Sequence, residues 1–128
     1  MKKIEIGDVF SIVTAKGLAF FQHVHYMPKI GELIRILPGL HIEMPDIADL
    51  CQREEQFCIF FPLKYALNKK IVNKVGKYDI PKGFRVPTHM RSKNIIKGEF
   101  IEWHIVNIET MHREPFKVLN NEQIKLSP

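Results

Sequence analysis

The chain has 128 residues and a mass of 15.0 kDa, with 45% hydrophobic and 26% charged residues. These values exclude a fibre or a disordered chain and are typical of one globular domain, which we expect to span residues 1–128. The net charge of +5 permits an anionic partner without requiring one. No apolar run approaches the roughly 20 residues that a membrane span needs, and Met1-Lys2-Lys3 leads into alternating polarity rather than a signal peptide. The sequence therefore predicts a cytoplasmic protein with no membrane association.

The charge is distributed unevenly along the chain. Residues 64–97 contain ten basic residues and one acid, Asp79, so this segment carries +9 and the rest of the chain carries −4. The acids concentrate between Glu43 and Glu55, with Arg53 as the one basic residue among them. We therefore expect the molecule to have a basic pole and an acidic pole.

Strand patterns dominate the first forty residues. Alternating polarity predicts three strands, over residues 9–14, 18–26 and 32–37. A short turn that ends at Gly17 joins the first two, which predicts a hairpin. In the second arm of this hairpin, alternation places Phe20 on the core face and Phe21 on an outer, mixed face with His23 and His25.

The middle of the chain predicts one main helix. Residues 45–50 lack a sustained helical stripe and predict a loop or a single turn, whereas the apolar residues 56–61 predict a buried strand. Pro62 then stands at the expected start of a helix, and Gly76 stands where its C-terminal cap is wanted. The apolar stripe between them recurs at three- and four-residue intervals and consists of Leu63, Ala66, Leu67, Ile71 and Val75.

The last fifty residues predict an irregular segment followed by strands. Regular patterns are lost over residues 77–98, which predicts a long irregular loop or a series of short extended pieces. Residues 100–108 predict a strand with Trp103 and Phe100 on opposite faces, and residues 116–119 and 120–123 predict an extended piece and a single helical turn. We therefore expect an α+β fold with a strongly bent, mostly antiparallel sheet and one main helix. An SH3-like open barrel at the N-terminal end is one form that this sheet could take.

Motifs for catalysis or metal binding are not indicated. His23 and His25 share a strand face, but no third ligand follows at the spacing of a zinc site. We interpret Cys51 and Cys58 as buried apolar residues, because Cys58 lies in the most apolar run of the chain, where a thiol stays protonated. The glycines are singly dispersed, so no phosphate-binding loop is predicted. We expect a protein without enzymatic activity, metal or cofactor.

The basic segment offers an alternative function, a small nucleic-acid-binding module. Its cations could neutralise phosphates while interleaved rings such as Tyr65, Tyr78 and Phe84 stack on bases. The acidic stretch would repel phosphate, which makes nucleic acid the less favoured partner. A third interpretation, a ligand-binding protein with an apolar pocket near Trp103, also stays open. The candidate anion-binding residues are Lys64, Lys69, Lys70, Lys74, Arg85 and Arg91.

Short motifs follow one another in a defined order along nearly the whole chain. They are Ile6-Gly7-Asp8-Val9-Phe10, the aromatic strand Leu18-Ala19-Phe20-Phe21-Gln22, Phe60-Phe61-Pro62-Leu63, Ile80-Pro81, the strand with Trp103, and the closing Leu119, Gln123 and Leu126. In this order and spacing, they resemble the immunity protein 26 family of bacterial polymorphic toxin systems. Residues 45–55 have no clear counterpart in that pattern.

The resemblance implies a small α+β cytosolic protein that binds a cognate toxin and neutralises it by occlusion, with no catalysis and no cofactor. It leaves the identity of the toxin and the oligomeric state open. We hypothesise that the toxin-binding surface combines the acidic stretch with exposed aromatic side chains, because charge pairs and aromatic side chains dominate tight complexes. The candidate toxin-binding residues are Phe21, Tyr26, Glu43, Asp46, Asp49, Glu54 and Glu55.

Overall fold

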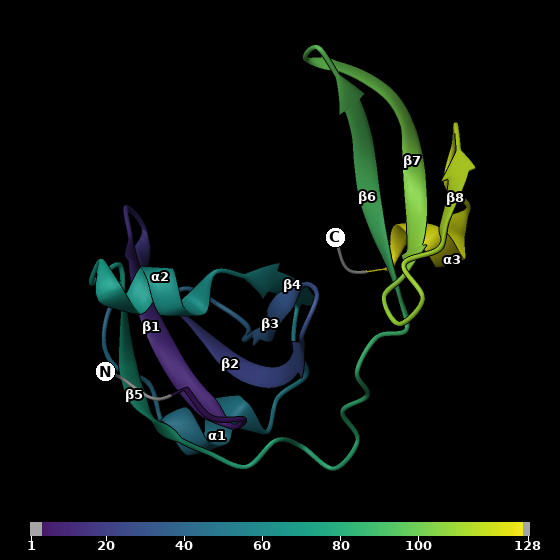
Figure 1. Ribbon diagram of the computed structural model, residues 1–128. Helices are drawn as coiled ribbons and strands as arrows, with labels where there is room; N and C mark the ends of the chain where they lie inside the picture. The colour runs from purple at the N-terminus through teal and green to yellow at the C-terminus, as the bar shows by residue number, and fades with distance from the viewer. Residues whose placement is uncertain (1–3, 127–128) are drawn as a thin grey trace. The chain divides into compact units, whose positions relative to one another are not determined.

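Antiparallel strands are the main secondary structure of the protein (Figure 1). The computed structural model describes residues 4–126, and the chain divides into two compact units, Met1–Arg85 and Val86–Pro128. The first unit contains β1 (Asp8–Thr14), β2 (Gly17–Met27), β3 (Gly31–Ile36), α1 (Ile47–Cys51), β4 (Phe57–Phe61), α2 (Leu63–Asn68) and β5 (Val72–Lys77). The second contains β6 (His89–Ile96), β7 (Glu99–Asn107), β8 (Arg113–Phe116) and α3 (Asn121–Ile124).

The first unit is built on a five-stranded antiparallel sheet with the order β4-β3-β2-β1-β5. Strands β1 to β4 follow one another as neighbours, whereas β5 returns to the outer side of β1 and pairs there. The sheet bends at irregularities in register between His23 and His25 and between Val9 and Phe10. Antiparallel strands with short helices confirm the expected α+β class. Within the described residues the sheet is open, with β4 and β5 at its edges, so the SH3-like barrel is not confirmed.

Helices cover both faces of this sheet. Figure 1 shows α2 and α1 on opposite sides of the sheet. One face packs Phe10 and Phe21 against buried residues of α2, and the other packs Phe20 against buried residues of α1. The predicted outer position of Phe21 is therefore wrong, since its side chain is only 3% exposed. Alternation correctly assigns Phe20 and Phe21 to opposite faces, but it does not reveal that a helix covers the second face as well.

The second half of the predicted helix is wrong, because these residues form a turn and a strand. Helix α2 ends at Asn68, the chain turns at Lys70 with a φ of 58°, and β5 begins at Val72. Val72 pairs with Ile12 of β1 and is buried, and Gly76 pairs with Val9 instead of capping a helix. The unpaired outer edge of β1 accounts for this outcome, because its backbone groups need hydrogen-bond partners that β5 supplies.

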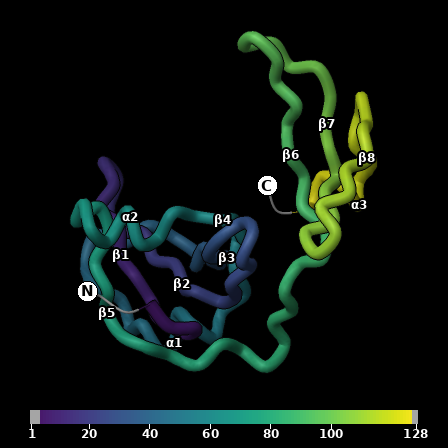
Figure 2. Tube along the Cα trace, in the orientation of Figure 1, coloured from purple at the N-terminus to yellow at the C-terminus, as the bar shows by residue number. Residues whose placement is uncertain are grey.

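The second unit is a three-stranded antiparallel sheet with the order β6-β7-β8, followed by α3. Strand β6 lies within the segment for which we predicted an irregular loop or short extended pieces. The irregular loop is wrong for the C-terminal half of this segment, which forms a regular strand of 8 residues. Lys97 and Gly98, both with positive φ, form the two-residue turn into β7, and Figure 2 shows the long hairpin that results. Many residues of β6 are polar or exposed, which hides the alternation that a half-buried strand would show.

The register of this hairpin changes the predicted faces of β7. Lys93 pairs with Trp103 and Asn94 with Glu102, but Ile95 pairs with Phe100, so Ile101 has no counterpart on β6. This bulge brings Phe100 onto the face of Trp103, and the two rings lie 5.6 Å apart in an edge-to-face arrangement. The final strand is Arg113–Phe116, so it lies before the predicted extended piece at 116–119 and overlaps it only at Phe116.

Candidate protein-binding surface

The segment after β3 exposes an unusual mixture of acidic and large apolar side chains. Three apolar residues are more than half exposed, and Ile42 reaches 92%. Four acids in the same part of the chain are also exposed. We call this set the 40–54 surface; its members are Leu40, Ile42, Met44, Glu43, Asp46, Asp49 and Glu54.

His41 fixes the apolar part of this surface to the sheet. Its backbone forms a bridge with Leu18, in which Leu18 N donates to His41 O at 2.7 Å and His41 N donates to Leu18 O at 2.8 Å. Its ring packs edge-to-face on Phe20 with the centroids 5.6 Å apart. Because successive residues of an extended chain point to opposite sides, the inward position of His41 turns Leu40 and Ile42 outward.

Helix α1 fixes the acidic part of the 40–54 surface to the sheet. The carboxylate of Asp46 caps the helix and accepts a hydrogen bond from Asp49 N at 3.2 Å. Ile47, Leu50 and Cys51 are buried against the sheet, which leaves the two aspartates on the outer side. Asp46 and Asp49 are thus held at a well-packed element.

A buried arginine holds the end of α1 in place. Arg35 of β3 is completely buried, and its guanidinium donates to Gln22 Oε1 at 2.8 Å, to Arg53 O at 3.1 Å and to Cys51 O. It also forms an ion pair with Glu55 at 3.2 Å. Glu55, one of the predicted toxin-binding residues, therefore has an internal partner, and Arg35 fixes the backbone next to Glu54.

Gln22 links this arginine to the start of β1. Its amide nitrogen donates to Tyr78 O at 2.9 Å and to Gly7 O at 3.2 Å. Gly7 has a φ of +98°, and a Cβ at this position would lie 2.9 Å from Tyr78 O, so only glycine fits without strain. The Gly7-Asp8 motif thus has a structural role in this chain.

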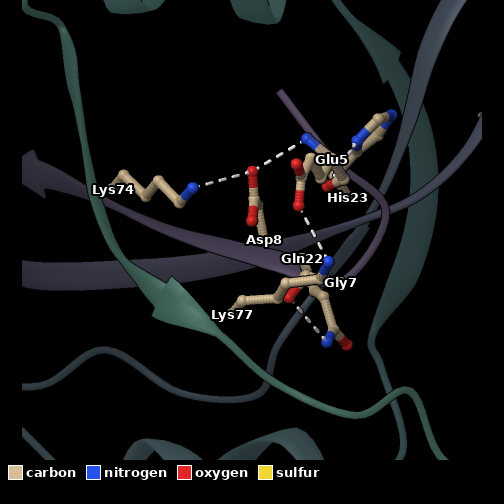
Figure 3. A network of polar contacts seen from close by, with 7 residues as sticks. All are labelled: Glu5, Gly7, Asp8, Gln22, His23, Lys74 and Lys77. Carbon is tan, nitrogen blue, oxygen red and sulfur yellow. Dashed lines mark hydrogen bonds and ion pairs between the residues drawn. The ribbon is translucent and has the colours of Figure 1, made fainter. Parts of the chain in front are cut away.

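Asp8 is the centre of a second set of polar contacts at the same end of the sheet (Figure 3). Its buried carboxylate accepts from Glu5 N at 2.9 Å and pairs with Lys74 at 3.2 Å. Lys77 pairs with Glu5 at 2.8 Å, and this hydrogen bond raises the pKa of Lys77. Lys74, a predicted anion-binding residue, is therefore engaged with an internal carboxylate.

The structure separates the other residues of the predicted anion-binding set. Lys64 lies on α2, Lys69 and Lys70 lie in the turn after it, and all three are exposed. Arg85 lines a cavity of about 420 Å³ together with Glu54 and Glu55, and Arg91 lies on β6 of the second unit. The basic segment is thus distributed over α2, β5, a loop and β6.

Of the two predicted aromatic residues, only Tyr26 is exposed, at 50%, whereas Phe21 is in the core. The prediction missed Leu40, Ile42 and Met44. They lie at every second residue after the Pro38-Gly39 turn, but alternation alone does not show whether another element covers such an apolar face.

The two cysteines are buried, as expected. Burial raises the pKa of the Cys51 thiol and, assisted by the nearby Glu55 carboxylate, raises the pKa of Cys58 to about 12. Such thiols stay protonated at neutral pH and are poor nucleophiles. Within residues 4–126, no group of three or more histidine, cysteine or acidic side chains could hold a metal ion, and no helix is long and apolar enough to cross a membrane.

Comparison with known proteins adds no relative. No family model, no curated protein and no solved structure matches the chain. The class that the fold defines is a small α+β protein of antiparallel sheets with short helices.

Proposed function

We propose that this chain is a non-catalytic immunity protein that acts in the cytosol, where it binds a cognate protein toxin and neutralises it by occlusion. The observation that carries this proposal is the 40–54 surface, where three exposed apolar side chains lie among exposed acids. The ordered motifs that resemble the immunity protein 26 family support the same function.

The composition of the 40–54 surface fits a protein partner with a basic surface. Apolar side chains that are desolvated on binding supply affinity, and a charged rim supplies rapid association and the correct orientation. Ile42 is the strongest candidate for a central contact, because 92% of it is accessible in this chain. A toxin that acts on nucleic acid would present the complementary positive charge at its substrate groove.

The rigidity of the surface supports tight binding. The bridge from His41 to Leu18 and the hydrogen bonds from Arg35 to the end of α1 hold the surface before a partner arrives. A preorganised surface loses less conformational freedom on association, so more of the interaction energy appears as affinity. Covering a groove requires about 800 Å² on each partner.

The proposal is tested by capture and then by affinity. The tagged protein is incubated with nuclease-treated lysate of the source organism, and a retained toxin is purified and titrated by calorimetry. We expect one-to-one binding that abolishes the toxin's activity, and we expect Ile42→Asp to weaken binding by a factor of at least about 30, which corresponds to about 2 kcal/mol.

A matched control uses the opposite side of the sheet. Charge reversal of Lys64, Lys69 and Lys70, on the exposed α2 side, changes the charge by the same amount as reversal of the three acids Asp46, Asp49 and Glu54. This control should leave affinity for the toxin within about twofold. Unchanged affinity in both Ile42→Asp and a triple reversal of Asp46, Asp49 and Glu54 would show that the 40–54 surface is not the binding site.

A further inference from the structure

The sheet of the second unit carries aromatic and cationic side chains on one face. The register places Lys93, Trp103 and Phe116 in one row across β6, β7 and β8. Because rows two positions apart share a face, the pair Ile95 and Phe100 lies on this face on one side of the row. The pair Arg91 and Ile105 lies on it on the other side. We call this set the Trp103 face; its members are Arg91, Lys93, Ile95, Phe100, Trp103, Ile105 and Phe116.

Two cations lie over the same indole ring. Arg91 Cζ is 5.5 Å and Lys93 Nζ is 5.4 Å from the centroid of the Trp103 ring. Within the described part of the chain, neither cation forms an ion pair with a carboxylate. Their positive charge is therefore held against an aromatic surface and is not neutralised.

A buried donor on this face also lacks an acceptor. Arg91 Nε is inaccessible to solvent and has no hydrogen-bond partner within the described residues. A buried N–H without an acceptor costs about 1–3 kcal/mol, and a ligand could reach this donor only if the Arg91 side chain moved. Beside it lies an open cavity of about 520 Å³ that is lined by Arg91, Ser92, Lys93 and Trp103.

The acids of the hairpin lie mainly on the opposite face. Glu102 pairs with Asn94 in the register, one row from Trp103, and its carboxylate contacts His104 at 3.2 Å and Lys117 at 3.8 Å. Glu114 lies on the same side of the sheet as the Trp103 face without belonging to that set; it pairs with Ile105, so the width of β7 separates it from Arg91. The region around Arg91 and Lys93 is thus left with positive charge.

We infer that the Trp103 face binds single-stranded nucleic acid. Bases stack on the aromatic side chains, and the backbone phosphates bind Arg91 and Lys93. Three rings lie next to one another on this face: Phe100, which is 48% exposed, lies beside Trp103, and Phe116 follows Trp103 across the sheet. Three neighbouring rings suit a nucleic-acid strand with successive bases better than one isolated nucleotide. This inference is independent of the proposed function, since it uses none of the residues of the 40–54 surface.

The sequence provides a direct reporter, because Trp103 is the only tryptophan of the chain. The full-length protein is titrated with an oligothymidylate while tryptophan fluorescence is recorded, and a fluorescein-labelled copy of the oligonucleotide is followed by anisotropy. Stacking of a base should quench the emission of Trp103. The affinity should fall log-linearly with salt, with a slope of about 0.7 for each phosphate contacted.

The double variant Arg91→Gln/Lys93→Gln should lose at least about tenfold in affinity, and its salt slope should fall by about 1.4 because two phosphate contacts are removed. The matched control Lys64→Gln/Lys69→Gln removes the same charge from the first unit and should bind like the unmodified protein. Trp103→Ala should weaken binding by a factor of at least about 5, as expected for the loss of one stacked base.

Three results would overturn the inference. The first is the absence of both quenching and an anisotropy change at micromolar oligonucleotide in low salt. The second is equal weakening by the two double variants, which would indicate attraction to the net charge alone. The third is binding of adenosine monophosphate as tightly as the oligonucleotide, which would indicate a pocket for a single nucleotide. Far-UV circular dichroism on each variant verifies that the sheet is retained.

Discussion

Arg35 provides a quantitative test of how the first unit holds α1. Replacement by methionine keeps most of the side-chain volume and removes the guanidinium. The hydrogen bonds to Gln22 Oε1, Arg53 O and Cys51 O are then lost, together with the ion pair with Glu55. Breaking a buried charge pair generally costs about 3–5 kcal/mol. The side chain of Glu55 is 25% exposed and can turn to solvent. We therefore expect Arg35→Met to lower the free energy of unfolding by about 3 kcal/mol, the lower limit of this range.

The loss is measured as the free energy of unfolding in urea, followed by far-UV circular dichroism. Tryptophan fluorescence is unsuitable for this purpose, since Trp103 lies in the other unit. Hydrogen exchange should also accelerate at the backbone amides of residues 50–53, at the end of α1. The matched control is Arg53→Met, which removes an exposed ion pair with Asp49 and should cost less than about 0.5 kcal/mol. A loss below 1 kcal/mol for Arg35→Met, or an equal loss in the control, would refute this account of Arg35.

Further predictions concern single positions of the same unit. Gly7→Ala should lower the free energy of unfolding by about 1–3 kcal/mol, because a Cβ meets Tyr78 O at 2.9 Å in a backbone with positive φ; an unchanged urea midpoint would contradict this. Lys70→Gly should raise the free energy of unfolding by up to about 1 kcal/mol, since Lys70 has a φ of 58°, which glycine adopts without strain. If residue 70 lay inside a helix, the same substitution would lower the free energy of unfolding. The pKa of Cys58 rises from 9.0 to about 12 on folding. Its contribution to the free energy of unfolding is therefore complete below pH 9, and it is lost as the pH rises towards 12 because the thiol of the unfolded chain ionises first. The stability difference between the unmodified protein and Cys58→Ala should therefore narrow by up to roughly 1.4 kcal/mol per pH unit in that range, and a constant difference would contradict the raised pKa.

Local patterns are sufficient to predict the N-terminal strands of the fold. The alternation before and after Gly17 and in residues 32–37 reflects strands whose neighbours in the chain are also their neighbours in the sheet. Strand β5 could not be found in this way. Its partner β1 lies some sixty residues earlier, and the apolar spacing from Leu63 to Val75 is compatible with a continued helix until that pairing is known.

The candidate site was predictable in its charge but not in its apolar residues. The acids from Glu43 to Glu54 are exposed as expected, since they lie in a connection that charged side chains solvate. Phe21 was expected to be exposed because alternation alone cannot show that α2 covers the second face of the sheet. Phe100 was assigned to the wrong face of β7 because one extra residue in a bulge reverses the alternation, and sequence periodicity does not reveal such an insertion.

Strand β1 pairs on both sides, and its second partner is made much later than its first. During synthesis, strands β1 to β4 emerge in sequence and can form their hairpins as soon as each is complete. The outer edge of β1 keeps open backbone groups until Val72–Lys77 has left the ribosome. During that interval the nascent chain exposes the outer edge of β1, which another chain could extend, and pairing with β5 then covers this edge.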